Sequence, residues 1–163
     1  MKKTFLTASA CALFLPLTAF AQSAHVHGAG ELNVAIDGNN ALVELHIPAN
    51  DVVGFENAPS DSSQQAAVDA ALAELGDGGL FWFSAGAQCS SSSADAEFEV
   101  EGDHAEFHIE YGYSCADGSA IDSISTFIFE LYVGVEELEA NVVTASGASA
   151  YEWNSENATL SLN

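Results

Sequence analysis

Three features of the sequence predict an α+β fold, with a mostly antiparallel sheet, one or two helices packed on one of its faces, and one disulfide. Two stretches, residues 32–47 and 97–113, alternate apolar and polar side chains around short turns, as hairpins with one buried face do. A segment with helical spacing follows Asp61. Two cysteines, Cys89 and Cys115, lie in the part of the chain that we expect to be exported.

The N-terminus is typical of a secretory signal peptide. The chain has 163 residues, 48% of them hydrophobic, which is enough for one domain with its own core. Lys2 and Lys3 precede a short apolar run that ends in a small-x-small site at Ala21. We therefore expect residues 1–21 to be removed and residues 22–163 to form a single acidic α+β domain.

The charge of the predicted mature chain excludes several classes of partner. It has 24 acidic residues and no lysine or arginine, so its formal side-chain charge is 0 − 24 = −24. Binding to a nucleic-acid backbone needs basic residues, and an anionic membrane surface would repel this chain. No later apolar stretch approaches the ~20 residues of a membrane span, so no membrane insertion is expected after processing. The field of the domain instead attracts cations.

The first predicted hairpin covers residues 32–47. Apolar side chains alternate with polar ones in residues 32–37 and again in residues 43–47. A two-residue turn at Asn39 and Asn40 would place both apolar sets on one face. This register predicts the pairs Ile36–Val43, Leu32–Ile47 and Asn33–His46.

The second predicted hairpin joins residues 97–101 to residues 104–113. A two-residue turn with Gly102 first, followed by Asp103, suits type II′ geometry. The predicted pairs are Phe98–Phe107, Val100–Ala105, Glu101–His104 and Glu97–His108. A carboxylate opposite each histidine is a sufficient structural role for either of them, and for His108 we favour a pairing with Glu97.

One helix and several strands complete the predicted fold. Asp61 caps the helix, Gly76 ends it, and its apolar stripe consists of Val68, Ala71, Leu72 and Leu75. Residues 121–131 fit both helical spacing and strand alternation, and we favour a helix. The remaining strands are expected at residues 80–83, 138–145 and 158–162, and chain breaks at residues 76–79, 90–93 and 116–119.

The cysteines predict one disulfide. Cys11 lies inside the signal peptide, whereas Cys89 and Cys115 enter an oxidising compartment after export. Closing a loop of about 25 residues would stabilise the fold by roughly 3–4 kcal/mol in the chain-entropy model. No Cys-x-x-Cys motif indicates a redox site.

Enzymatic activity is not expected. No serine lies in a Gly-x-Ser-x-Gly elbow, and no arginine or lysine is present to clamp a charged substrate. Carboxylates occur throughout the chain, so no acid–base pair stands out.

Metal binding is the sharper hypothesis. His25 and His27 are separated by one residue, so in an extended chain their rings lie on the same side, ~6.6 Å apart along the strand, and can converge on one ion. His104 and His108 would lie ~13 Å apart on a regular strand, so at most one of them joins a given site. Imidazoles with carboxylates suit zinc, and copper or nickel would compete. Cleavage after Gln22 instead of Ala21 would make His25 the third residue of the mature chain, an arrangement that favours the binding of Cu(II) or Ni(II). The alternative is a solvated segment that binds no metal.

Several short motifs occur together over most of the predicted mature chain. They are His25-x-His27-Gly28 leading into Glu31-Leu32-Asn33-Val34, then Pro48-Ala49, Gly54-Phe55-Glu56, Ala58-Pro59, Gln65-Ala66-Ala67, Cys89, and His104-x-x-Phe107-x-x-x-Tyr111-x-Tyr113-x-Cys115. With this combination the chain resembles the zinc-regulated periplasmic zinc-uptake family (ZrgA-like). The resemblance implies a Gram-negative periplasmic protein that binds zinc and assists its uptake under zinc limitation, in contact with a component of the uptake system.

The resemblance also marks candidate ligands. His25, His27 and His104 stand at matching positions, and chemistry makes Glu56 or water the fourth ligand of a Zn²⁺ ion. The family often has a histidine where this chain has Asn57. Some members carry a long His/Asp-rich insertion, where this chain has only a serine run and a few acidic residues. We therefore expect a single site, with His46 on the strand surface.

A second hypothesis needs no metal. An envelope interaction module could dock on a transporter or another periplasmic protein through Leu80-Phe81-Trp82-Phe83. Such a run is more often part of a core than of an interface.

Overall fold

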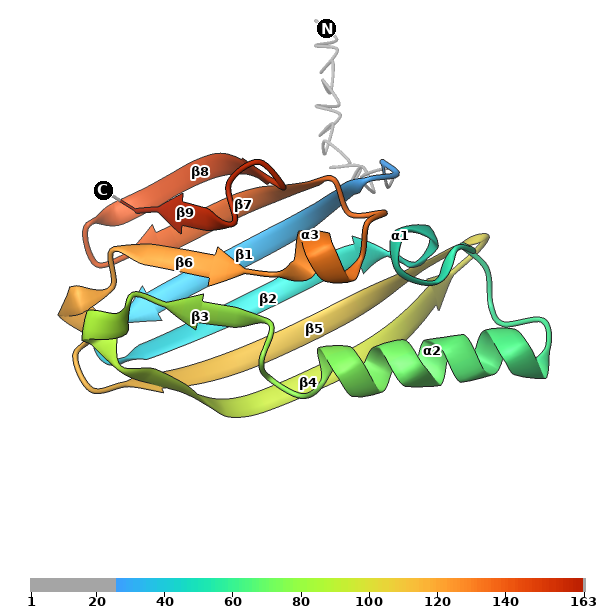
Figure 1. The fold of residues 1–163 in the computed structure, drawn as a ribbon, viewed down its shortest axis with the longest axis horizontal. Coiled ribbons are helices and arrows are strands. Elements are labelled where there is room, and N and C mark those ends of the chain that lie inside the picture. Colours follow the sequence, from blue (N-terminus) through green and yellow to red (C-terminus); the bar gives the residue numbers. More distant parts are fainter. Residues whose placement is uncertain (1–25, 163) are drawn as a thin grey trace, which may run out of the picture.

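A six-stranded sheet forms one layer of the structure. The computed structural model describes residues 26–162, and within them the strand order of this sheet is β4-β5-β2-β1-β7-β8 (Figure 1). All neighbours are antiparallel except β1 and β7, which are parallel, so the sheet is mixed. The strands are β1 (Ala29–Asp37), β2 (Asn40–Pro48), β4 (Cys89–Glu101), β5 (His104–Cys115), β7 (Glu137–Thr144) and β8 (Gly147–Asn154).

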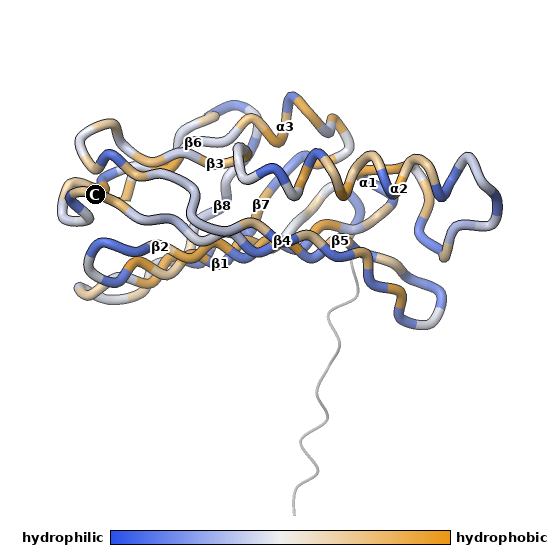
Figure 2. The backbone as a smooth tube through the Cα atoms, turned by 90° about the horizontal axis from the view of Figure 1, so that it is seen from below, coloured by the Kyte–Doolittle hydropathy of each residue, from blue (hydrophilic) through white to orange (hydrophobic). Residues whose placement is uncertain are grey.

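The second layer covers one face of this sheet (Figures 1 and 2). It consists of three helices and a three-stranded sheet of order β3-β6-β9, together with two short 3-10 turns, η1 (Ala85–Ala87) and η2 (Gly118–Ala120). The helices are α1 (Ala49–Val53), α2 (Ser62–Leu75) and α3 (Ile128–Leu131), and the strands are β3 (Phe81–Phe83), β6 (Ser123–Thr126) and β9 (Thr159–Ser161). The predicted antiparallel pairing and one-sided helix packing are therefore present. The parallel pair and the second sheet were not predicted. No helix in residues 26–162 is long and apolar enough to cross a membrane.

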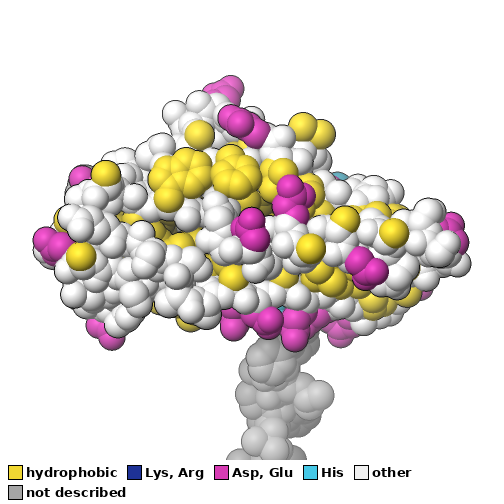
Figure 3. Space-filling view, turned by 60° about the horizontal axis from the view of Figure 1, so that its bottom comes forward, with side chains coloured by type: hydrophobic (Ala, Val, Ile, Leu, Met, Phe, Trp, Pro, Cys, Tyr) yellow, Lys and Arg dark blue, Asp and Glu magenta, His cyan; other side chains and the backbone are white. Residues whose placement is uncertain are grey.

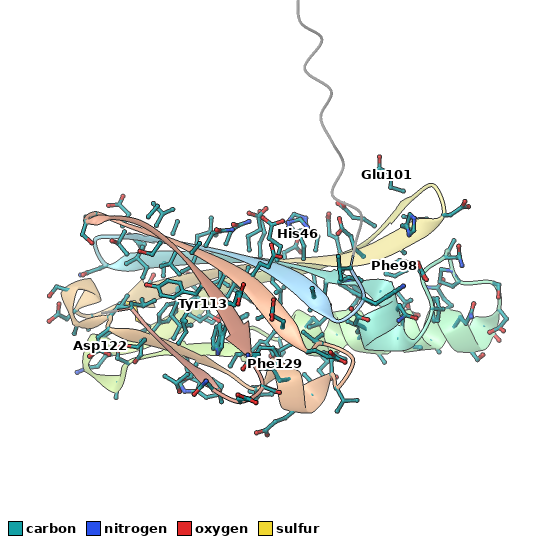
Figure 4. The ribbon with its side chains drawn as sticks, turned by 90° about the horizontal axis from the view of Figure 1, so that it is seen from above. His46, Phe98, Glu101, Tyr113, Asp122 and Phe129 are labelled. Atoms are coloured by element: carbon teal, nitrogen blue, oxygen red, sulfur yellow. A yellow bond between two sulfur atoms is a disulfide. The ribbon has the colours of Figure 1, made fainter. Side chains whose placement is uncertain are left out.

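The core lies between the two layers. On the central strands of the large sheet, alternate residues point inward and are buried, among them Leu45, Phe107 and Ile109. Figure 4 shows Phe98 and Tyr113 on this inner side and His46 on the outer side. Since the second layer covers only the inner face, the outer face of the sheet is exposed, and it carries mostly polar side chains together with a few apolar ones such as Leu42 and Val143.

The β4–β5 hairpin has the predicted register. Phe98 lies opposite Phe107, and Glu97 lies opposite His108. Gly102 takes a φ of 64° at the first turn position, a conformation that glycine adopts without a Cβ penalty.

At the other end of this hairpin, the start of β4 differs from the prediction. Ser90–Ser93 is not a chain break but part of β4, with a register shift between Ser91 and Ser93. β4 is an edge strand, so these serines remain exposed while the backbone pairs with β5. Cys89 lies opposite Cys115, and the two form the predicted disulfide.

The β1–β2 hairpin differs from the prediction by a two-residue shift. The observed pairs are Ile36–Ala41, Leu32–Leu45 and Glu31–His46, in place of Ile36–Val43, Leu32–Ile47 and Asn33–His46. The turn is Gly38-Asn39, not Asn39-Asn40, because Gly38 takes a φ of 57° at the first turn position. A shift of two leaves the apolar side chains on the same face.

Helix α2 agrees with the sequence prediction. The carboxylate of Asp61 accepts hydrogen bonds from the backbone N–H groups of Ser63 and Gln64, and the helix ends at Gly76. Its buried residues are Val68, Ala71 and Leu75.

The helix favoured over residues 121–131 is wrong for most of that stretch. The chain forms strand β6 and then only the single turn of α3, because Ile124 and Thr126 alternate into the core. The Thr126 hydroxyl donates to the Leu80 carbonyl and accepts from the Ile128 N–H, which ends the strand and begins the turn.

Candidate metal centre

The outer face of the large sheet is strongly acidic. Glu110 of β5 lies between Glu44 on β2 and Asp95 on β4 in the strand register. On the other half of the sheet, Glu139 lies between two further glutamates, Glu31 and Glu152. Like charges directly opposite one another destabilise a sheet, and no lysine or arginine is present in the described chain to offset them. Figure 3 shows acidic side chains crowded along this side of the molecule. The face therefore attracts cations.

Three of the four predicted ligands meet at one end of this sheet. The Glu56 carboxylate lies between two imidazoles: its Oε1 is 3.3 Å from His27 Nε2, and its Oε2 is 3.3 Å from His104 Nδ1. We call His27, Glu56 and His104 the rim cluster. Both histidine side chains are exposed, His27 at 56% and His104 at 61%. The remaining predicted ligand, His25, lies outside the described residues.

A buried carboxylate positions His27. The side chain of Asp51 is only 4% exposed, and its Oδ2 accepts a hydrogen bond of 2.8 Å from the Gly28 N–H. The Gly28 carbonyl in turn accepts from the N–H groups of Glu136 and Glu137. With a φ of 85°, Gly28 turns the chain into β1 and directs His27 toward the end of the sheet. Asp51 Oδ1 lies 4.0 Å from His27 Nδ1, which is beyond hydrogen-bond distance, so Asp51 acts on His27 through Gly28.

A glycine turn positions Glu56. Helix α1 follows β2 directly and ends at Gly54, whose φ of 81° reverses the chain while its N–H donates to the Asn50 carbonyl. Phe55 then packs against the core, and Glu56 lies beside the start of β5. His104 is the first residue of β5, after the Gly102 turn. Three segments that are distant in sequence thus form the rim cluster.

The rim cluster has the right donors for zinc but not yet the arrangement of a closed site. Each imidazole contacts a different oxygen of the one carboxylate, so a single ion would require Glu56 to turn and the two rings to face each other. All three side chains are at least one-third exposed, so solvent ions can reach their ligand atoms. Imidazole nitrogens and a carboxylate are a donor set that zinc accepts.

A second group of histidines and carboxylates lies further along the outer face. His46 of β2 lies opposite His108 of β5, and their rings stack with centroids 4.3 Å apart and planes 15° apart. Oε1 of Glu44 is 3.4 Å from Nε2 of His46 and 3.4 Å from Nε2 of His108. We call Glu44, His46 and His108 the sheet-face cluster. Their side chains are partly buried, with exposures of 29% for His46 and 22% for His108.

Carboxylates surround the rings of the sheet-face cluster. Nδ1 of His46 lies 3.7 Å from Oε1 of Glu106, and Nδ1 of His108 lies 3.9 Å from Oε1 of Glu99. In the metal-free protein Glu106, and after it Glu44, raise the pKa of His46 to about 9, which outweighs the lowering by burial. The nearest carboxylate oxygen to His108 thus belongs to Glu44, although Glu97 is its neighbour in the strand register as predicted.

The sequence predicted that the residues of the rim cluster lie together, but it did not predict the sheet-face cluster. His46 was predicted to be a strand-surface histidine and His108 the partner of Glu97. Their contact depends on β2 lying beside β5, a pairing of strands that are not consecutive in the chain. The available signal was that both histidines alternate with glutamates on strands whose other face is apolar.

The alternative docking segment is mostly core. Leu80, Phe81 and Phe83 are buried, and only Trp82 is exposed, with its ring stacked on Phe127. Figure 3 shows apolar side chains gathered on this layer of the molecule.

The fold and the two clusters define a class: a β-rich domain with an acidic sheet face that groups histidines with carboxylates. In the sheet-face cluster the ligand atoms lie close enough together to hold a metal ion. The profile of the ZrgA family zinc uptake protein matches residues 24–162. The chain belongs to this family, which confirms the resemblance seen in the sequence. A search of curated proteins finds no match.

Proposed function

We propose that this protein is a periplasmic zinc-binding accessory protein that assists zinc uptake when zinc is scarce. Zinc is its cargo, and a component of the uptake system receives the ion. In the rim cluster His27 and His104 bind the ion, His25 supplies a further imidazole, and Glu56 or water occupies the remaining position. Family membership and the exported, acidic character predicted from the sequence support this proposal.

The convergence of His27 and His104 on Glu56 is the observation that carries the proposal. Two contacts of 3.3 Å join side chains from three separate segments on a face that attracts cations. The cluster is exposed, which suits an ion that must be taken up and then passed on. Its ligands must be deprotonated, so binding weakens as the pH falls through the histidine range.

Equilibrium dialysis of zinc against the processed, tag-free protein tests the ligand assignment. The double variant His27→Ala/His104→Ala should bind one zinc ion fewer per chain than wild type. Asn57→Ala, an exposed neighbour of Glu56, serves as the matched loop control and should bind as wild type does. Unchanged zinc binding in both His27→Ala/His104→Ala and His25→Ala/His27→Ala would remove the rim cluster as the site.

Two further measurements test the location and the role in uptake. The intact mass of protein taken from the periplasm of a Gram-negative host should correspond to a chain that begins at Gln22. Deletion of the gene in the native host should lower the cell's zinc content in zinc-depleted medium and leave it unchanged in zinc-replete medium. An unprocessed mass in the cytoplasm, or equal zinc content in depleted medium, would contradict the proposal.

A further inference from the structure

We infer that the sheet-face cluster is a second zinc site, with Nε2 of His46, Nε2 of His108 and a carboxylate oxygen of Glu44 as its three protein ligands. The inference rests on the proposed function for the identity of the ion. It differs from the sequence-based expectation of a single site.

The distances between these atoms fit one tetrahedral ion, and the stacked rings, whose planes are 15° apart, must turn toward each other so that both Nε2 atoms point at it. With zinc–ligand bonds of about 2.0–2.2 Å, neighbouring ligand atoms of a tetrahedral site lie about 3.3–3.6 Å apart. Oε1 of Glu44 is 3.4 Å from each of the two Nε2 atoms. One ligand atom from each of the three residues lies within 4.8 Å of the others. In the rim cluster, by contrast, the two imidazoles face different oxygens of Glu56.

The opposite side of each ring supports the same assignment. Nδ1 of His46 faces Glu106 and Nδ1 of His108 faces Glu99, at 3.7 and 3.9 Å. A carboxylate near Nδ1 favours a proton on that nitrogen, so Nε2 is the atom that can bind a metal once it carries no proton, and a carboxylate on this side of the ring is usual around zinc-bound histidine. Three neighbouring strands thus supply the three ligands and a carboxylate near the other nitrogen of each ring.

One buried nitrogen also lacks a hydrogen bond. Within the described residues, Nε2 of His108 is buried and makes none, because its 3.4 Å contact with Glu44 does not have hydrogen-bond geometry. Buried polar atoms are normally satisfied, and an exception indicates a missing partner. A zinc ion between His108 and Glu44 would supply that partner.

The second site is separate from the rim cluster. His104 and His108 lie on the same face of β5, four residues apart, which corresponds to ~13 Å along the strand. No single ion can be bound by both histidines. Glu106 lies between them on the same strand face, so the two sites are neighbours on one acidic surface.

Zinc stoichiometry tests this inference with the whole processed protein. Wild type should bind two zinc ions in equilibrium dialysis, and His46→Ala/His108→Ala should bind one. The matched control is Asn33→Ala/Asn141→Ala, which removes two hydrogen-bonded polar side chains from the same sheet face and should bind two ions. Equal stoichiometry in wild type and His46→Ala/His108→Ala would overturn the inference. Loss of an ion only in His27→Ala/His104→Ala would do so too, while leaving the proposed function intact.

Side-chain nitrogen NMR of the wild-type protein keeps the test valid if the double variant does not fold. Zinc addition should shift the Nε2 resonances of His46 and His108, while Glu44→Gln, which preserves side-chain shape, should weaken binding at this site tenfold or more. Unchanged Nε2 resonances at saturating zinc would overturn the inference. Shifts of His46 and His108 without any change at His27 and His104 would support it and contradict the rim assignment instead.

Discussion

The rim cluster and the sheet-face cluster use the same side chains but are built from different parts of the fold. Loops and strand ends supply His27, Glu56 and His104, and these side chains are exposed. Paired strands supply the sheet-face cluster, where backbone register holds two partly buried rings in a stack. Groups that are held in place before binding lose less conformational freedom on binding. We therefore expect the sheet-face cluster to bind zinc more tightly and the rim cluster to exchange it faster.

Loss of the disulfide should have the largest effect on stability, because the bond closes the loop that contains the β4–β5 hairpin. Cys89→Ser/Cys115→Ser opens a loop with a sequence separation of 26 and should lower the free energy of unfolding by about 3–4 kcal/mol. Urea unfolding followed by circular dichroism measures this change. If the variant still folds, both clusters should retain zinc, since the bond lies at the end of the β4–β5 ribbon opposite to His104. Wild-type stability in the variant would contradict the prediction.

Asp51→Ala should weaken zinc binding at the rim cluster and leave the sheet-face cluster unchanged. The substitution removes the buried acceptor of the Gly28 N–H and should lower the free energy of unfolding by about 1–3 kcal/mol. Because Asp51 orients His27, the zinc affinity of the rim cluster should fall about tenfold, with no change at the sheet-face cluster. Zinc titrations followed by histidine NMR report on both clusters in one sample. Equal losses at the two clusters would show that Asp51 acts on the whole fold.

Glu106→Gln should have the smallest effect and should be confined to the sheet-face cluster. In the metal-free protein the pKa of His46 is raised from 6.5 to about 9, first by Glu106. Since the pKa is higher in the folded state, protonation stabilises the fold fully below pH 6.5, and this contribution is lost as the pH rises through about 9. Proton NMR of the metal-free protein should show His46 titrating near pH 9 in wild type and at lower pH in Glu106→Gln. A His46 midpoint that is the same in both proteins would contradict this cause.

The same comparison shows what could be predicted from the sequence. The β4–β5 register followed from local alternation and a glycine in the first turn position, so Glu97 opposite His108 was correct. In the β1–β2 hairpin, Gly38, Asn39 and Asn40 are all residues that favour turns. The prediction chose Asn39-Asn40, and the register was therefore wrong by two residues. Alternation is a local signal, and it identifies hairpins without showing how they lie side by side.

The candidate sites also divide into what local sequence patterns can predict and what depends on how separate segments pack. The rim residues were found through short motifs that the family shares, without knowledge of the fold. The stack of His46 on His108 exists only because β2 pairs with β5, which no local pattern specifies. Asp51 was missed for a related reason, since its burial and its bond to Gly28 depend on contacts between separate segments.

Anomalous diffraction at the zinc edge, from crystals of the metal-free protein soaked in zinc, tests most directly whether histidine–carboxylate clusters or diffuse negative charge bind the ion. Two peaks are expected, one within coordination distance of Glu44, His46 and His108, and the other at Glu56 with His27 or His104. Peaks confined to carboxylates remote from the histidines, such as Glu31, Glu139 and Glu152, or no peak at all, would contradict the account.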